Sequence, residues 1–246
     1  MTSVIIPTSN EAQHLSATLE AIAAAGVDVC HEVVVIDAGS NDQTATIASA
    51  HGARVVPSAR RQRAAQMNLG AEQARGDVLL FLHGDTLLPA QALEKIERLM
   101  QDRRVVGGAF ARRYDSHSSL LRVTCALAGV RARLSGWFLG DQGIFARAEL
   151  FQKMSGFQEF DLFEDLDFSR RLRREGRVVM LRPPVISSAR RFQRFGPWRT
   201  TWADFALTYR YLRGVAPNCL AAENRRTHGT KDVHRSFTDR AGLMTL

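Results

Sequence analysis

The sequence predicts an α/β fold, in which a Rossmann-like, mostly parallel sheet is flanked by helices and followed by a C-terminal amphipathic helical segment. Strand-like and helix-like patterns alternate four times in the first hundred residues, which is typical of a doubly wound sheet. The run 77–83 is apolar almost throughout, as in a strand buried on both faces. Acidic residues follow several strands, at the edge where open α/β sheets hold ligands.

Each expected strand is a short apolar or β-branched run, and each expected helix has apolar residues three and four positions apart. Asn10 is expected to cap the first helix, and Pro89 to stand at the start of the fourth. In the first half we expect strands at 3–7, 32–37, 54–57 and 77–83, and helices at 10–25, 43–51, 61–75 and from 89 onward. In the second half we expect a strand at 105–112, a helix at 118–134, a glycine-bearing loop at 136–143, helices at 147–154 and from 164, and a strand at 178–181.

The chain is strongly basic, with a formal net charge of +8 over 246 residues. Nearly all of the positive charge is arginine, which favours phosphorylated ligands or anionic lipid surfaces, although a GC-rich genome would give the same bias. The three scattered cysteines predict neither a disulfide framework nor a structural zinc site. The sequence shows no recognisable nucleic-acid-binding module, so we expect no nucleic-acid partner.

Acidic residues at two strand ends are candidate ligand contacts. Asp37 ends the second strand, where an acid can accept hydrogen bonds from a ribose hydroxyl or a base, or else only cap the turn. Asp85 ends the most apolar strand, and one carboxylate beside a diphosphate is a usual way to hold Mg²⁺ or Mn²⁺. His83 would add a nitrogen ligand or be a satisfied core histidine.

A third acidic position lies near a predicted helix N-terminus, at Glu164 and Asp165. Neighbouring carboxylates raise one another's pKa, which suits a general base, so Asp165 is the candidate base; simple helix capping is the alternative. Arg63 belongs to a basic cluster that would grip a pyrophosphate or form a solvated turn. A dinucleotide-binding GxGxxG loop is missing after the first strand, which weighs against a dehydrogenase.

Taken together, the segments VIIPTSNEA, VVVIDAGSNDQT, GDVLLFLHGDT, GDQGIFARAELFQKMSGF and EDLDFSRRLRREG resemble a family 2 glycosyltransferase with the GT-A fold. The closest resemblance is to the small bacterial "family 2-like" transferases with HxDT and GDQG motifs, some of them associated with arsenosugar biosynthesis. Two departures are visible. His83 stands where the family's metal motif has its first aspartate, and 190–194 (RRFQR) takes the place of the QxxRW signature.

The resemblance implies an inverting transfer of a sugar from a nucleotide-diphosphate sugar, a UDP-sugar above all, to an acceptor hydroxyl on a small molecule or lipid. Mn²⁺ or Mg²⁺ would assist as cofactor. The implied residues are Thr8, Glu11 and Asp37 for the nucleoside, Asp85 and His83 for the metal, Arg63 for the diphosphate, Asp141 and Gln142 for sugar or acceptor hydroxyls, and Asp165 with Glu164 for base catalysis. Two alternatives stay open: a non-catalytic nucleotide-sugar-binding protein, and a sugar-phosphate nucleotidyltransferase, although the latter's glycine-rich, arginine-bearing loop is missing.

We expect a GT-A domain at 1–195, with a nucleotide-binding half at about 1–100 and an acceptor half at about 101–195. An amphipathic helical segment at 196–222 and a polar, disordered tail at 223–246 would follow. Aromatic residues recur every three or four positions within 198–213, beside arginines; such a helix would lie on an anionic membrane, on the protein's own core or on a second subunit of a homodimer. No apolar run is long enough to span a membrane, so we expect a cytoplasmic protein, with peripheral contact at the inner membrane face left open.

Overall fold

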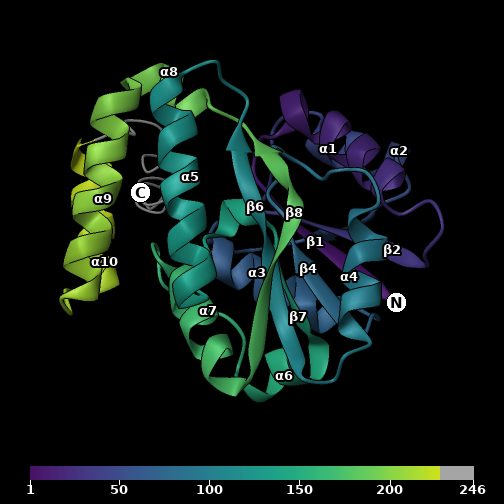
Figure 1. Ribbon diagram of the computed structural model, residues 1–246. Coiled ribbons are helices and arrows are strands. Elements are labelled where there is room, and N and C mark those ends of the chain that lie inside the picture. Colours follow the sequence, from purple (N-terminus) through teal and green to yellow (C-terminus); the bar gives the residue numbers. More distant parts are fainter. Residues whose placement is uncertain (228–246) are drawn as a thin grey trace, which may run out of the picture.

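The computed structural model describes residues 1–227. Its centre is an eight-stranded sheet with the strand order β3-β2-β1-β4-β7-β6-β8-β5 (Figure 1). The strands are β1 (Thr2–Thr8), β2 (His31–Asp37), β3 (Arg54–Pro57), β4 (Val78–Phe81), β5 (Thr86–Leu87), β6 (Val105–Tyr114), β7 (Ile144–Arg147) and β8 (Arg177–Ser187). β1, β2, β3 and β4 are parallel, as are β6 and β8, whereas β7 is antiparallel to both β4 and β6. The prediction of an α/β fold with a mostly parallel sheet is confirmed.

Helices cover both faces of the sheet (Figure 1). They are α1 (Ala12–Ala25), α2 (Thr44–Ala50), α3 (Arg63–Gln73), α4 (Ala92–Met100), α5 (Ser119–Ser135), α6 (Ala148–Lys153), α7 (Glu164–Glu175), α8 (Arg190–Phe195), α9 (Pro197–Leu212) and α10 (Pro217–Thr227), with a short 3-10 helix at Gly140–Gln142. Successive residues of β1 point to opposite faces, as in any strand. Val4 and Ile6 therefore pack with α1 and α4, whereas Ile5 packs with α3 and α7. This packing fixes the strand ends that carry the polar residues.

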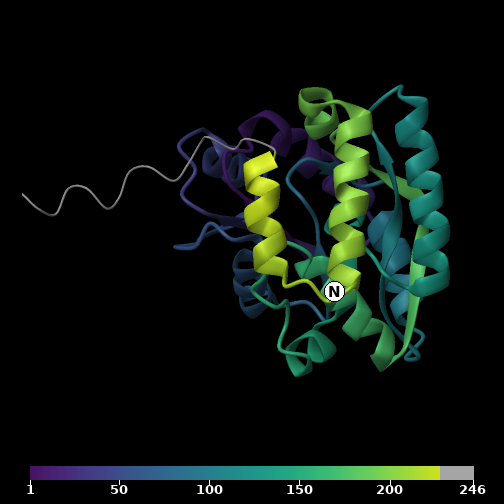
Figure 2. The same cartoon turned by 90° about the vertical axis from the view of Figure 1, so that its left-hand side faces the viewer.

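At one edge of the molecule α9 lies beside α5, and α10 lies on the other side of α9 (Figures 1 and 2). Leu207 of α9 and Leu220 of α10 are buried against Phe163 and Leu166, at the start of α7. Part of the amphipathic segment thus packs on the core of the domain itself. The expected start of a disordered tail at 223 is wrong, because α10 continues to Thr227; residues 228–246 lie outside the described range.

Several expected boundaries also differ. Asn10 does not cap α1: it has a left-handed φ of 57°, and Glu11 is the residue before the helix. Pro89 does not begin α4, which starts at Ala92 after a left-handed Gln91. β7 was not predicted: it lies between the loop expected at 136–143 and the helix expected from 147, and it takes the first residue of that helix. Within residues 1–227 no helix is both long and apolar enough to cross a membrane.

Candidate active site

Two adjoining hollows form one cleft at the carboxyl ends of β1, β4 and β6. The first, of about 370 Å³, is bordered by Thr8 and Glu11, and the second, of about 260 Å³, by Asp141 and Asp165. Both hollows are lined by Arg63, His83, Asp85, Ser188 and Arg191. Most of the predicted site residues therefore meet in one cleft, although they come from distant parts of the chain.

At the first hollow, Thr8 and Asp37 lie side by side on neighbouring parallel strands. The Thr8 hydroxyl donates to Asp37 Oδ1 at 3.1 Å, and the Ser40 backbone N–H donates to Asp37 Oδ2 at 2.9 Å. Gln66 Nε2 donates to the carbonyl oxygens of Thr8 and Ile36. Asp37 is almost buried and does not line either hollow, so its oxygens hold the loop that follows β2 beside the Thr8 wall of the cleft.

Arg190 joins the two acids at the floor of the first hollow. Its Nη1 and Nη2 donate to the Glu11 carboxylate at 2.8 and 2.7 Å, and Nη2 lies 3.2 Å from Asp85 Oδ2. Burial raises the pKa of Asp85, and Arg190 opposes that rise. In this structure the guanidinium of Arg190 is therefore the cation that balances Asp85 and Glu11.

His83 contributes an uncharged nitrogen to the same region. Burial, followed by the positive charge of Arg63, lowers the pKa of His83 to about 3, so the imidazole is neutral at pH 7. Its Nε2 atom is buried and has no hydrogen-bond partner among the described residues. A buried ring nitrogen without a hydrogen-bond partner is costly, which makes Nε2 a candidate contact for a bound ligand or ion.

Asp165 and Glu164 occupy the first turn of α7, as predicted. Asp165 accepts hydrogen bonds from the backbone N–H groups of Gly140 at 2.5 Å and of Leu166 at 2.6 Å. Burial and then the neighbouring Glu164 charge raise the pKa of Asp165 to about 7, against the opposing effects of those N–H groups and of Arg63. This value suits a group that must take up a proton near neutral pH.

Gly140, the first glycine of the GDQG loop, is needed for the close approach of the loop to Asp165 and His83. A Cβ atom on Gly140 would lie 2.9 Å from His83 Nε2 and 3.2 Å from Asp165 Oδ2. Arg63 completes the arrangement: its Nη1 donates to Glu164 Oε1 at 3.2 Å, with Glu164 buried and Arg63 half exposed. The loop, the β4 end and the start of α7 thus converge around the Asp165 carboxylate.

Asp141 and Gln142 lie in the GDQG loop but differ in position. Both oxygens of Asp141 accept from Arg112 Nη1, at 2.6 and 2.5 Å, and Oδ2 also accepts from the Tyr114 hydroxyl at 3.0 Å. Burial would raise the pKa of Asp141, but Arg112 outweighs it, and the pKa is lowered. Gln142 does not line the cleft: its amide bonds the Phe110 carbonyl and the Leu139 N–H.

Sequence reasoning missed Arg112 and Tyr114, although Arg112 ends the strand predicted at 105–112, where ligands are expected, and β6 continues to Tyr114. It also missed the contribution of α9, whose Asp204, Leu207 and Thr208 line the second hollow. No sequence pattern could show that this helix folds back on the cleft.

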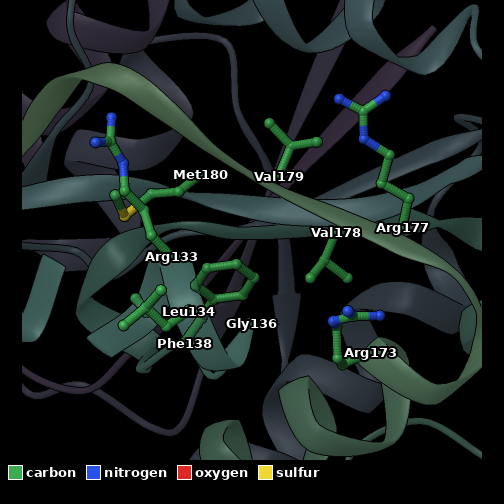
Figure 3. Close-up of a pocket in the computed structure, with 10 residues that line it drawn as sticks. Arg133, Leu134, Gly136, Phe138, Arg173, Arg177, Val178, Val179 and Met180 are labelled. Atoms are coloured by element: carbon green, nitrogen blue, oxygen red, sulfur yellow. The ribbon is translucent and has the colours of Figure 1, made fainter. Parts of the chain in front are cut away.

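A third hollow, of about 460 Å³, lies away from these residues, between the end of α5 and the start of β8 (Figure 3). Arg133, Arg173 and Arg177 border it, but their side chains extend in separate directions and do not converge (Figure 3). Arg177 is also paired with Asp102, at 3.7 Å. This hollow is therefore not an anion site of the kind that the cleft offers.

The fold and the cleft are those of a GT-A domain, and solved structures agree. A Pyrobaculum calidifontis mannosyltransferase, PcManGT, solved with GDP-Man and Mn²⁺, matches 91% of this chain and 69% of its own, at 22% identity and a TM-score of 0.67. Staphylococcus aureus TarS 1–349 with UDP matches 76% of this chain and 60% of its own, at 18% identity and a TM-score of 0.62. These likenesses show that the fold is GT-A.

Sequence comparison gives the family. The model "Glycosyl transferase family 2" matches residues 3–155, and the chain belongs to this family. It is 32% identical over 126 residues to an undecaprenyl-phosphate 4-deoxy-4-formamido-L-arabinose transferase of Pseudomonas aeruginosa, covering 47% of this chain and 37% of that protein. It is 31% identical to glycosyltransferase AglE of Haloferax volcanii, covering 48% and 45%. The chain thus spans less than half the length of these relatives.

Proposed function

We propose that the protein is an inverting glycosyltransferase that moves a sugar from a nucleotide-diphosphate sugar to an acceptor hydroxyl, with Asp165 as general base. The observation that carries this proposal is the Asp165 carboxylate, which has a pKa of about 7 and lies in the same cleft as Asp85 and Arg63. Family membership supports the reaction class. The division of the domain into a nucleotide-binding half (1–100) and an acceptor half (101–195) is part of the same proposal, as is the arsenosugar-type subgroup.

The donor would lie in the first hollow. Thr8 and Glu11 border it, and Asp37 shapes the adjoining loop, so these residues would contact or position the nucleoside. Arg63, Arg190 and Arg191 also line it, and guanidinium groups bind phosphate oxygens in bidentate geometry. UDP-sugar is the donor we propose; the PcManGT and TarS structures hold GDP-Man and UDP, respectively.

The residues of the cleft fit a divalent metal that shares its coordination with a diphosphate. Asp85 offers a carboxylate, and neutral His83 offers the unpartnered Nε2. Within residues 1–227, no three His, Cys, Asp or Glu side chains are grouped to hold an ion by themselves. We therefore propose that Asp85 and His83 hold Mn²⁺ or Mg²⁺ together with donor phosphates. When bound, the metal would neutralise charge that grows on the departing diphosphate.

The chain itself would supply the proton transfer. Asp165, ionised above about pH 7, accepts the proton of the acceptor hydroxyl. The hydroxyl oxygen then attacks the anomeric carbon from the face opposite the leaving group, forming the new C–O bond as the bond to the diphosphate breaks. Glu164 keeps the pKa of Asp165 high, and the Gly140 N–H holds its Oδ2 in place. Asp141 would act chiefly through Arg112 and Tyr114, which line the hollow with it, and Gln142 through the loop that it braces.

The acceptor would enter by the second hollow, whose wall is partly apolar, with Leu162, Phe163, Phe192 and Leu207 among its residues. Such a wall suits a lipid or an apolar small molecule. The Pseudomonas relative is named for an undecaprenyl-phosphate substrate. We propose a cytoplasmic location, with contact at the inner membrane face or a homodimer through 198–213.

Nucleotide binding and donor turnover test the function together. Thermal unfolding with UDP, GDP, CDP and dTDP, each with and without Mn²⁺, identifies the nucleotide, because a ligand at a hundred times its Kd stabilises the fold by about 2.7 kcal/mol. Release of that nucleoside diphosphate from its sugar donor is then followed with hydroxyl acceptors, including membrane lipid extract.

Asp165→Asn should abolish release and keep nucleotide binding, whereas Asp28→Asn, at an exposed acid far from the cleft, should change neither. Transfer by the Asp165→Asn variant would refute the base assignment. Binding without turnover by the unmodified protein would favour the non-catalytic alternative, and binding of no nucleotide would refute the donor assignment.

A further inference from the structure

Exposed apolar side chains concentrate on two helices. Among residues 1–227, nine of the eleven exposed large hydrophobic side chains belong to α5 or α9, and the other two are Met1 and Val27. The apolar ridge, as we call this set, consists of Val123, Leu127, Val130 and Leu134 on α5 and Trp198, Trp202, Phe205, Tyr209 and Leu212 on α9. The spacing is four, three and four residues on α5 and four, three, four and three on α9, so each set forms one stripe along its helix.

The two stripes lie on neighbouring helices. α5 and α9 lie side by side in both views and contact each other (Figures 1 and 2). Leu134 is 82% exposed and Trp198 is 74% exposed, so the ridge is not covered within the described chain. A concentration of exposed apolar side chains on two neighbouring helices indicates an interaction site.

The charges beside the ridge identify the partner. α5 carries the exposed Arg122 and Arg133 and no acidic residue, whereas its third arginine, Arg131, is half buried and donates to the Trp137 carbonyl oxygen. The one acid of α9, Asp204, is bonded to Arg191. Arginines that flank an apolar stripe suit an anionic lipid surface, and tryptophan favours the interface between headgroups and acyl chains. A second copy would present the same arginines, with no acid on α5 and only the Arg191-bonded Asp204 on α9 to pair with them, which favours an anionic surface over a dimer.

Helix α9 contributes to both the apolar ridge and the cleft. α9 turns Leu207 and Thr208 into the second hollow, while Trp202 and Phe205 are exposed. One helix thus separates the exposed ridge from the hollow proposed for the acceptor. A bilayer against the ridge would lie close to the mouth of that hollow.

We propose that α5 and α9 together form a docking surface for an anionic lipid bilayer. The inference extends the amphipathic segment 198–213 to a helix 63 positions earlier in the chain, and it does not depend on the proposed transfer reaction. No described helix is both long and apolar enough to span a membrane, and the exposed stripe of α5 lies on the helix next to α9.

Sedimentation with vesicles tests the proposal. The full-length protein is mixed with vesicles of phosphatidylcholine alone and with vesicles that contain 40% phosphatidylglycerol, a composition chosen to be strongly anionic. We expect binding to the anionic vesicles, weakened by high salt, because each arginine near the surface contributes about fivefold. Leu127→Ser/Leu134→Ser on α5 and Trp198→Ser/Trp202→Ser on α9 should each weaken binding at least about tenfold.

Val27→Ser is the matched control, since Val27 is 77% exposed but lies outside the ridge, and it should leave binding unchanged. Unchanged thermal unfolding would show that the ridge variants are folded. Binding that survives the α5 substitutions would refute the joint surface. Failure to bind anionic vesicles, or a dimer in solution that the ridge variants dissociate, would overturn the membrane proposal.

Discussion

Replacement of Asp165 by asparagine should make the stability of the protein respond differently to pH. An ordinary aspartate has a pKa of 3.8, whereas that of Asp165 is raised to about 7. Between these values the folded state binds a proton that the unfolded state has lost, so stability falls as pH rises and levels off above about 7. At high pH the wild-type fold carries an unfavourable charge that the Asp165→Asn variant lacks.

The size of the effect follows from the pKa. Between pH 5 and pH 8, the free energy of unfolding of the wild type falls only over the roughly two pH units below the folded pKa of Asp165. At 1.36 kcal/mol per unit, this fall is about 3 kcal/mol. Asparagine has one carbonyl oxygen, so the variant loses one of the hydrogen bonds from Gly140 and Leu166, at a cost of about 1–3 kcal/mol. That cost is nearly independent of pH and does not alter the difference between the two conditions.

Urea unfolding at pH 5, 6, 7 and 8 measures the free energy of unfolding of both proteins. We expect the variant to gain about 3 kcal/mol relative to the wild type from pH 5 to pH 8, while its m-value stays the same. Asp28→Asn, at an exposed site, should show no such gain. A wild-type-to-variant difference that is constant over this range would mean that Asp165 has an ordinary pKa, and the argument for it as a base near neutral pH would fail.

Three further substitutions test the arrangement of the cleft. Glu164→Gln removes the charge that helps to raise the pKa of Asp165. In a plot of transfer rate against pH, the rise on the acid side should therefore move from near pH 7 to a pH about one unit lower. An unchanged midpoint would contradict the coupling between the two carboxylates. Gly140→Ala places a Cβ 2.9 Å from His83 Nε2 and should lower turnover at least about tenfold with nucleotide binding retained. Gly129→Ala, where the added Cβ meets open space, should leave turnover unchanged. Wild-type turnover by Gly140→Ala would show that the loop moves to make room for the Cβ. Asp141→Asn leaves buried Arg112 without its carboxylate and should lower the free energy of unfolding in urea by about 3 kcal/mol; a loss below 1 kcal/mol would mean that solvent screens the pair.

The first half of the fold follows from local pattern. The strand at 54–57 was predicted with its observed boundaries, and the strand that ends at Asp37 lies within one residue of its expected start, because apolar runs between turns mark buried parallel strands. The antiparallel β7 was not predicted, because it runs directly into α6 without a turn and its partners β4 and β6 are distant in sequence. Helix starts were less reliable, because Asn10 and Gln91 adopt left-handed φ values that sequence alone does not reveal.

The residues of the candidate site were likewise predictable only in part. Asp85 and Asp165 could be found from their places after a strand and at a helix start, and the structure brings both to one cleft. Pairings between distant residues could not be found. Arg112 with Asp141, and Arg190 with Glu11, depend on strand register and on how β8 leads into α8. Local signals identify which residues end an element, whereas their partners depend on packing.

The contacts of Arg190 with Asp85 and Glu11 affect how a metal and a nucleotide would bind in the cleft. Its guanidinium lies 3.2 Å from Asp85 and bonds both oxygens of Glu11, so the acids at the cleft floor are already balanced by a charge of the chain. A divalent cation that bound Asp85 alone would have to compete with this arginine. A cation that arrives with a diphosphate offers the guanidinium new oxygens, because arginine binds phosphate at least as readily as carboxylate. Metal and nucleotide should therefore bind cooperatively, with Arg190 moving its hydrogen bonds from the acids to the phosphates.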